Sequence, residues 1–183
     1  MIKKIKKVNL LKNGIYVNDV EIYSFTKEQN TADTLKEIYR HLKIDYPKFF
    51  KMDNLSKLGF LSTEMLLENI DNKEDVGIVL STSSSSLETD TVFQKTIQNK
   101  ENFFPSPSVF VYTLPNIVIG EICIRHKIYG ENMMFIIKEN ELAHFYHQTE
   151  KIIQEIGVKQ GIIGYLECYN NNFKAEFILV ENQ

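Results

Sequence analysis

Two short apolar runs, each of strand length, constrain the fold of this chain more than any other feature. Residues 76–82 (VGIVLST) and 133–137 (MMFII) are continuous rather than alternating, which is typical of strands buried on both faces. The sequence between them has two helical patterns, at residues 87–99 and 116–127. This succession predicts a three-layer α/β domain with a mixed sheet, in which both runs are internal strands.

Weaker patterns complete the prediction. Ser85 and Glu88 match a capping box, which favours a strand-to-helix turn at the serine run Ser83–Ser86. Asp53 is a suitable N-cap for a helix that extends to Ile70. The remaining elements are expected as a strand or short hairpin at 14–23, helices at 31–42 and 141–156, and a closing hairpin of strands 160–169 and 173–181.

The helix predicted at residues 116–127 has apolar side chains on nearly every side. A helix without a polar face is buried, either in a core or in an interface. Gly120 in its middle weakens the helix by roughly 1 kcal/mol relative to alanine. We therefore expect this glycine to permit close packing against a neighbour.

The composition is that of a soluble globular protein, with 43% hydrophobic and 25% charged residues. A length of 183 residues predicts one domain over residues 1–183. The net charge of −3 gives no reason to expect nucleic-acid binding, and no apolar run is long enough to predict a membrane span. Two cysteines, Cys123 and Cys168, make no disulfide framework, which indicates reduced thiols and a cytoplasmic location.

Histidine spacing raises the question of a metal. Glu141, His144 and His147 follow one another at helical spacing and could in principle share a metal ion. Metal sites normally need further ligands from other segments, and no cluster supplies them here. The pattern favours a polar helix face, so we expect neither a metal nor a cofactor.

Four segments, in order along the chain, resemble β-ketoacyl synthases. They are residues 50–58 (FKMDNLSKL), 77–90 (GIVLSTSSSSLETD), 107–130 with its central TLPN, and 165–167 (YLE). The resemblance covers most of residues 45–169 and implies the N-terminal half of the thiolase-like fold, βαβαβαββ, with helices on both faces of a mixed sheet. A complete synthase repeats this half and is about twice as long, so the second half is expected to be absent.

The resemblance fails at one position. The nucleophilic cysteine of β-ketoacyl synthases lies nine residues after the glycine that matches Gly130, and here that position is Glu139. A carboxylate cannot form the acyl thioester on which condensation depends. Glu139 is either a helix N-terminal residue that favours the dipole, or a replacement for the nucleophile like that of chain-length-factor subunits, which usually carry a neutral amide there.

The resemblance also implies an interface and a pocket position. The strand that matches residues 133–137 pairs with its equivalent across the family's dimer, and the helix at 116–127 packs near the same axis. Leu114 matches a position that lines the acyl pocket of the family, although an apolar residue beside a buried helix is more often part of the core. The dimer-interface candidates are Asn116, Met133, Met134, Phe135, Ile136 and Ile137.

These features predict a non-catalytic synthase-like protein of fatty-acid, polyketide or aryl-polyene-type biosynthesis. The expected role is to dimerise with, shape or stabilise a competent ketosynthase, as a homodimer or heterodimer, with an acyl carrier protein as a further candidate partner. Two alternatives stay open. One is a cysteine-independent acyltransferase or malonyl-carrier-protein decarboxylase, and the other is an acyl-group binding protein.

Overall fold

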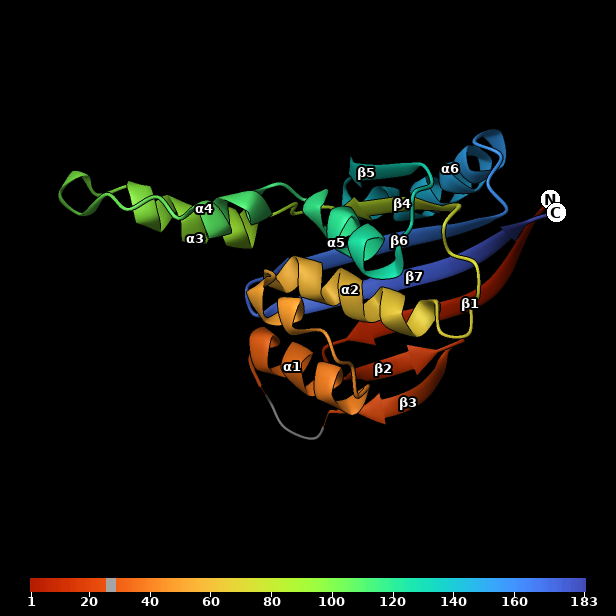
Figure 1. The fold of residues 1–183 in the computed structure, drawn as a ribbon, viewed down its shortest axis with the longest axis horizontal. Coiled ribbons are helices and arrows are strands. Elements are labelled where there is room, and N and C mark those ends of the chain that lie inside the picture. Colours follow the sequence, from red (N-terminus) through yellow and green to blue (C-terminus); the bar gives the residue numbers. More distant parts are fainter. Residues whose placement is uncertain (26–28) are drawn as a thin grey trace.

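A single seven-stranded sheet organises the chain (Figure 1). This computed structural model describes residues 1–25 and 29–183. The spatial order of the strands is β3-β2-β1-β7-β6-β4-β5, with β4 parallel to β5 and β6 and the other neighbours antiparallel. The strands are β1 (Ile2–Leu11), β2 (Gly14–Val17), β3 (Val20–Ser24), β4 (Val76–Thr82), β5 (Asn132–Ile136), β6 (Gln160–Tyr169) and β7 (Asn172–Asn182).

Helices cover both faces of this sheet, which confirms the predicted three-layer α/β class. In Figure 1, α1, α2 and α5 lie in front of the sheet and α6 lies behind it. Between β4 and α5, the chain projects beyond the sheet as an arm (residues 83–116) that contains α3 and α4. The helices are α1 (Thr31–His41), α2 (Asn54–Leu66), α3 (Leu87–Ile97), α4 (Pro107–Phe110), α5 (Ile117–His126) and α6 (Leu142–Glu155).

The two faces of β7 explain how one sheet serves two cores. Phe177 and Leu179 join the large cluster under α2, whereas Ile178 and Val180 join the smaller cluster under α6. This follows from the two-residue period of a strand, which sends successive side chains to opposite faces. The nearly continuous apolar sequence at the end of β7 is therefore the signature of a strand covered on both sides.

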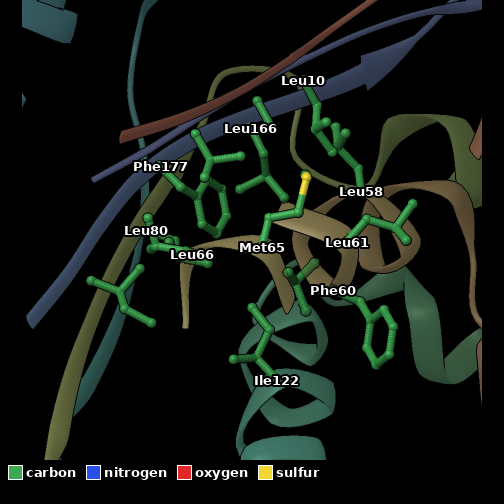
Figure 2. Close-up of a cluster of buried hydrophobic side chains, with 14 of the residues drawn as sticks. Leu10, Leu58, Phe60, Leu61, Met65, Leu66, Leu80, Ile122, Leu166 and Phe177 are labelled. Carbon is green, nitrogen blue, oxygen red and sulfur yellow. The ribbon is translucent and has the colours of Figure 1, made fainter. Parts of the chain in front are cut away.

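Helix α2 is the centre of the larger core. Its side chains Leu58, Leu61 and Met65 lie with Leu10 and Leu166 of the sheet (Figure 2). Asp53 caps the helix as predicted, because its side chain accepts a hydrogen bond from the backbone N–H of Ser56 at 2.9 Å. The helix ends at Leu66, four residues before the predicted end.

Both predicted hairpins form. Asn18 and Asp19 join β2 to β3 with φ of 50° and 65°, and Asn170 and Asn171 join β6 to β7 with φ of 51° and 56°. Two-residue loops of this kind need positive φ at both positions, which asparagine and aspartate tolerate best after glycine. The side chain of Asn171 also accepts a hydrogen bond from the N–H of Thr31 at the start of α1.

Strand β5 is not the internal strand that its apolar sequence predicts. It lies at one edge of the sheet, and within the described part of the chain its only partner is β4. Phe135 and Ile136 are 36% and 63% exposed. A run of apolar residues has the same sequence whether the chain itself covers it or leaves it at an open edge, so the run alone does not predict which of the two applies. Pairing of this strand across a dimer, as the resemblance implies, stays a prediction.

In helix α5, the close packing expected at Gly120 is wrong, whereas burial of the helix in an interface stays a prediction. Helix α5 buries Val118, Ile119 and Ile122 on one side only, while Ile124 is 62% exposed, and a Cβ at Gly120 would meet nothing within 4 Å. Gly120 therefore permits no close contact.

The capping box predicted for Ser85 and Glu88 in the turn before α3 does not form, and the side chain at the N-cap position makes no capping hydrogen bond. Ser85 has a left-handed backbone with φ of 55°, and Ser86 is the N-cap residue. Glu88 does not reach back to the turn but accepts a hydrogen bond from Asn54 Nδ2 at 2.7 Å, and Thr89 donates to Asp53. These two contacts fasten the base of the arm to the start of α2.

Candidate functional site

Glu139 lies beside a pocket near the C-terminal ends of β4 and β5. It begins a short 3₁₀ turn, Glu139–Glu141, that leads into α6. Ligand sites of open α/β sheets occur at this end of the parallel strands. The pocket has a volume of about 320 Å³ and is lined by Ser83, Ser84, Glu139, Tyr165, Glu167, Tyr169, Asn172, Phe173 and Lys174.

Glu167 is the hydrogen-bonding centre of this pocket. Its carboxylate accepts from the backbone N–H of Ser83 at 2.9 Å and of Ser84 at 3.0 Å, and both serine hydroxyls donate to it as well. The phenolic hydroxyl of Tyr165 also donates to the Glu167 carboxylate, at 2.9 Å, and so does the hydroxyl of Thr82, at 3.1 Å. The four donors of Ser83 and Ser84 fix the serine turn onto β6, and all six donors together leave Glu167 little capacity for an added ligand.

The donors also set the protonation states. Burial alone would raise the pKa of Glu167, but the hydrogen bonds from Ser83 and Ser84 outweigh burial and lower it, so Glu167 is ionised. Burial raises the pKa of Tyr165 to about 12, with a further contribution from the negative charge of Glu167. Tyr165 is therefore a neutral hydrogen-bond donor at pH 7, and Lys174 places its ammonium 5.7 Å from the centre of the Tyr165 ring.

The pocket contains carboxylates, hydroxyls and an amine, but neither thiol of the chain. Cys123 lies in α5 and Cys168 in β6, and neither lines the pocket. Burial raises the pKa of both thiols, which disfavours the reactive thiolate. Acyl-thioester chemistry of the ketosynthase kind has no nucleophile at this site.

The structure places the other predicted residues away from this pocket. Leu114 follows the 3₁₀ turn Val111–Thr113 at the end of the arm and is 52% exposed. Asn116 is exposed and directly precedes α5. Met133 to Ile136 belong to the edge strand β5, and Ile137 directly follows it. Their assignments as acyl-pocket and interface residues stay predictions.

Sequence reasoning missed the partners of Glu167. Ser83 and Glu167 are 84 positions apart, and the parallel register that aligns Ser81 with Tyr165 brings them together. The available signal was a serine run directly after a buried strand, since small hydroxyl residues with free backbone N–H groups suit an anionic group.

Two findings concern the rest of the described chain. In residues 1–25 and 29–183, no three His, Cys, Asp or Glu side chains gather closely enough to hold a metal ion. No single helix in these ranges has both the length and the apolar composition to cross a membrane, while one bent pair, Pro107–Thr113 with Ile117–His126, meets these criteria only jointly.

Comparison with known proteins gives structural matches alone. No family model matches the chain, and no characterised protein is detectably similar to it in sequence. The complex of the ketosynthase ApeO with its chain length factor ApeC from Xenorhabdus doucetiae matches with a TM-score of 0.70 at 13% identity, over 100% of this chain and 79% of that one.

Two further complexes match similarly. The ishigamide ketosynthase/chain length factor gives a TM-score of 0.74 at 14% identity, over 99% of this chain. AntDE:AntF, a type II polyketide acyl carrier protein with its ketosynthase, gives 0.64 at 12% identity, over 100% of this chain. In both cases this chain spans only 62% of the matched chain. The chain therefore has the thiolase-like fold of ketosynthases and their chain length factors.

Proposed function

We propose that this chain is a non-catalytic ketosynthase-like protein that forms a dimer with an active ketosynthase of polyketide or fatty-acid biosynthesis. The fold, shared with chains from ketosynthase and chain length factor complexes, supports the class of partner. The carboxylate at Glu139, in a pocket without a thiol, supports a role other than condensation. The observation that carries the proposal is the distribution of exposed apolar side chains.

Most of the large apolar side chains exposed in the described residues belong to one stretch of chain, from the start of α3 to the end of β5. Monomeric proteins scatter such residues singly, and concentrations of them mark interaction surfaces. The arm, α5 and β5 each contribute. We call this set the apolar edge: Leu87, Val92, Phe103, Phe104, Phe110, Val111, Leu114, Ile124, Tyr129, Phe135 and Ile136.

The backbone of β5 supports the same surface. An edge strand with apolar side chains and open N–H and C=O groups is a template for pairing with another chain. The opposite edge, β3, also exposes Val20 and Ile22, but it alternates them with Glu21 and its pairing with β2 is interrupted by a register shift near Tyr16, so it is the poorer template. A partner strand on β5 would continue the sheet and cover Phe135 and Ile136.

The test is a charge placed on β5. Phe135→Lys puts an ammonium into the proposed interface and should abolish co-purification of a ketosynthase, identified by mass spectrometry, from the cells that make this protein. Val20→Lys places the same charge on the opposite edge strand, β3, at a residue that is 64% exposed against 36% for Phe135, and as the control it should leave the complex intact. A complex that survives Phe135→Lys, with unchanged mass in solution, would contradict the proposed dimer.

The pocket at Glu139 favours one competing function, a cysteine-independent decarboxylase or acyltransferase. Glu139 and Lys174 share a 320 Å³ pocket with the ordered serine turn, which is enough room for a small acyl group. Incubation of the isolated chain with malonyl-carrier protein separates the two functions. Turnover that is lost in Glu139→Gln would establish the enzyme, whereas turnover only in the presence of the ketosynthase partner supports the non-catalytic role.

A further inference from the structure

A second pocket lies away from both Glu139 and β5. It has a volume of about 490 Å³ and is formed at the C-terminal ends of α2 and α5, with the residues that follow α1. Leu42, Ile44, Met65 and Leu67 give it an apolar wall. Nothing in the proposed dimer uses this pocket, so the two can be tested separately.

His126 is the buried polar group of this pocket. Only 9% of its side chain is exposed, and its Nε2 atom is buried without a hydrogen-bond partner among the described residues. Glu64 Oε1 lies 3.2 Å from Nε2 but makes no hydrogen bond with it, and Arg125 Nε donates to the same oxygen at 2.7 Å. A buried nitrogen without a partner is costly unless a water or a ligand satisfies it.

The charges around His126 leave a local excess of positive charge. The carboxylate of Glu64 is held by both Nε and Nη2 of Arg125, and Glu68 is paired with Lys6 at 3.3 Å. Both carboxylates that line the pocket are therefore neutralised within the protein. Two lysines that also line it, Lys73 and Lys127, make no ion pair or side-chain hydrogen bond with any described residue.

We propose that this pocket binds a small organic anion, a carboxylate or phosphate with a short apolar chain. The anionic group would accept hydrogen bonds from Nε2–H of His126 and lie between the ammonium groups of Lys73 and Lys127. The apolar chain would lie against Leu42 and Leu67. The volume accommodates a ligand of this size, and the lining combines an apolar side with a larger polar and charged side, as an amphipathic anion requires.

The test compares three probes of the same chain length: hexanoate, hexan-1-ol and hexylammonium. Each is titrated into the full chain, and binding is followed by backbone amide NMR shifts at Leu67, His126 and Lys127. Hexanoate should shift these amides saturably, and the alcohol and the ammonium should bind about tenfold or more weakly, since they lack the charge that the two lysines attract.

Variants assign the binding to the pocket. Lys73→Gln with Lys127→Gln should weaken hexanoate binding about tenfold, and Ile44→Trp should weaken all three probes by filling the cavity. Lys12→Gln with Lys151→Gln, which removes the same charge from exposed positions elsewhere, should leave binding unchanged. Equal binding of hexan-1-ol, full binding by the Lys73/Lys127 variant, or shifts confined to the apolar edge would each overturn the proposal.

Discussion

Moderate acid should destabilise this protein through His126, in a pH range where few other side chains titrate. Burial lowers the pKa of His126 to about 4 from its usual value of 6.5, and the nearby charges of Lys73 and Arg125 add to this effect. The negative charge of Glu64 opposes it but does not prevail. The folded protein therefore holds a neutral imidazole at pH values at which the unfolded chain has already bound a proton.

The sign and size of the effect follow from that difference. The stabilisation is fully present above the unfolded pKa of 6.5 and is lost as the pH falls toward 4, because only the unfolded state gains a proton in that window. One pKa unit corresponds to about 1.4 kcal/mol, so the whole interval is worth about 3 kcal/mol. By pH 5 the loss should have reached about 2 kcal/mol.

The measurement is urea unfolding at pH 7.5 and pH 5.0, on the wild-type protein and on His126→Gln. Other titrating groups contribute to both proteins, so the difference between their pH dependences isolates the imidazole. The wild-type free energy of unfolding should fall by about 2 kcal/mol more than that of the variant. Equal pH dependences would refute the reasoning, because they would mean that His126 titrates normally in the folded state.

Three substitutions test other parts of the structure. Gly120→Ala should raise the free energy of unfolding of the isolated chain by about 0.5–1 kcal/mol, because the added methyl group meets nothing; a loss of stability would place an unseen neighbour there. Gly59→Ala should instead lower the free energy of unfolding by about 1–3 kcal/mol, because the new Cβ would lie 2.4 Å from Val118 Cγ1. A urea midpoint equal to that of the wild type would contradict the close packing of α2 on α5. Glu167→Gln leaves several donors of the serine turn without an anionic acceptor and should cost about 1–3 kcal/mol in the same assay, whereas a neutral result would show that water replaces the carboxylate.

Local sequence patterns predict most of the fold. Strand β4 begins and ends at the predicted residues, and the asparagine-rich turns at Asn18 and Asn170 adopt the positive φ that their position between strands requires. These features depend on neighbouring residues in the chain. A single sequence is sufficient for them because turn chemistry and side-chain periodicity act over a few positions.

The wrong predictions concern what lies next to an element. The sequence of β5 does not distinguish an internal strand from an apolar edge, and that of α5 does not predict that Gly120 has no close neighbour. The network around Glu167 depends on the register of β4 against β6, which no local pattern specifies. Pairing between distant strands and burial by a partner are properties of the folded assembly, and they require the structure.

The first and last strands have a practical consequence. Strands β1 and β7 pair along their length, and the amino group of Met1 donates to the carbonyl oxygen of Gln183 at 2.7 Å (Figure 1). A few glycines could join these ends, and a new break in the exposed loop at Asp71 would leave every strand pair in place. Such a circular permutant would move the chain ends from this corner of the sheet to the loop at Asp71. Fluorescent labels could then be attached at the new termini without contact with the arm.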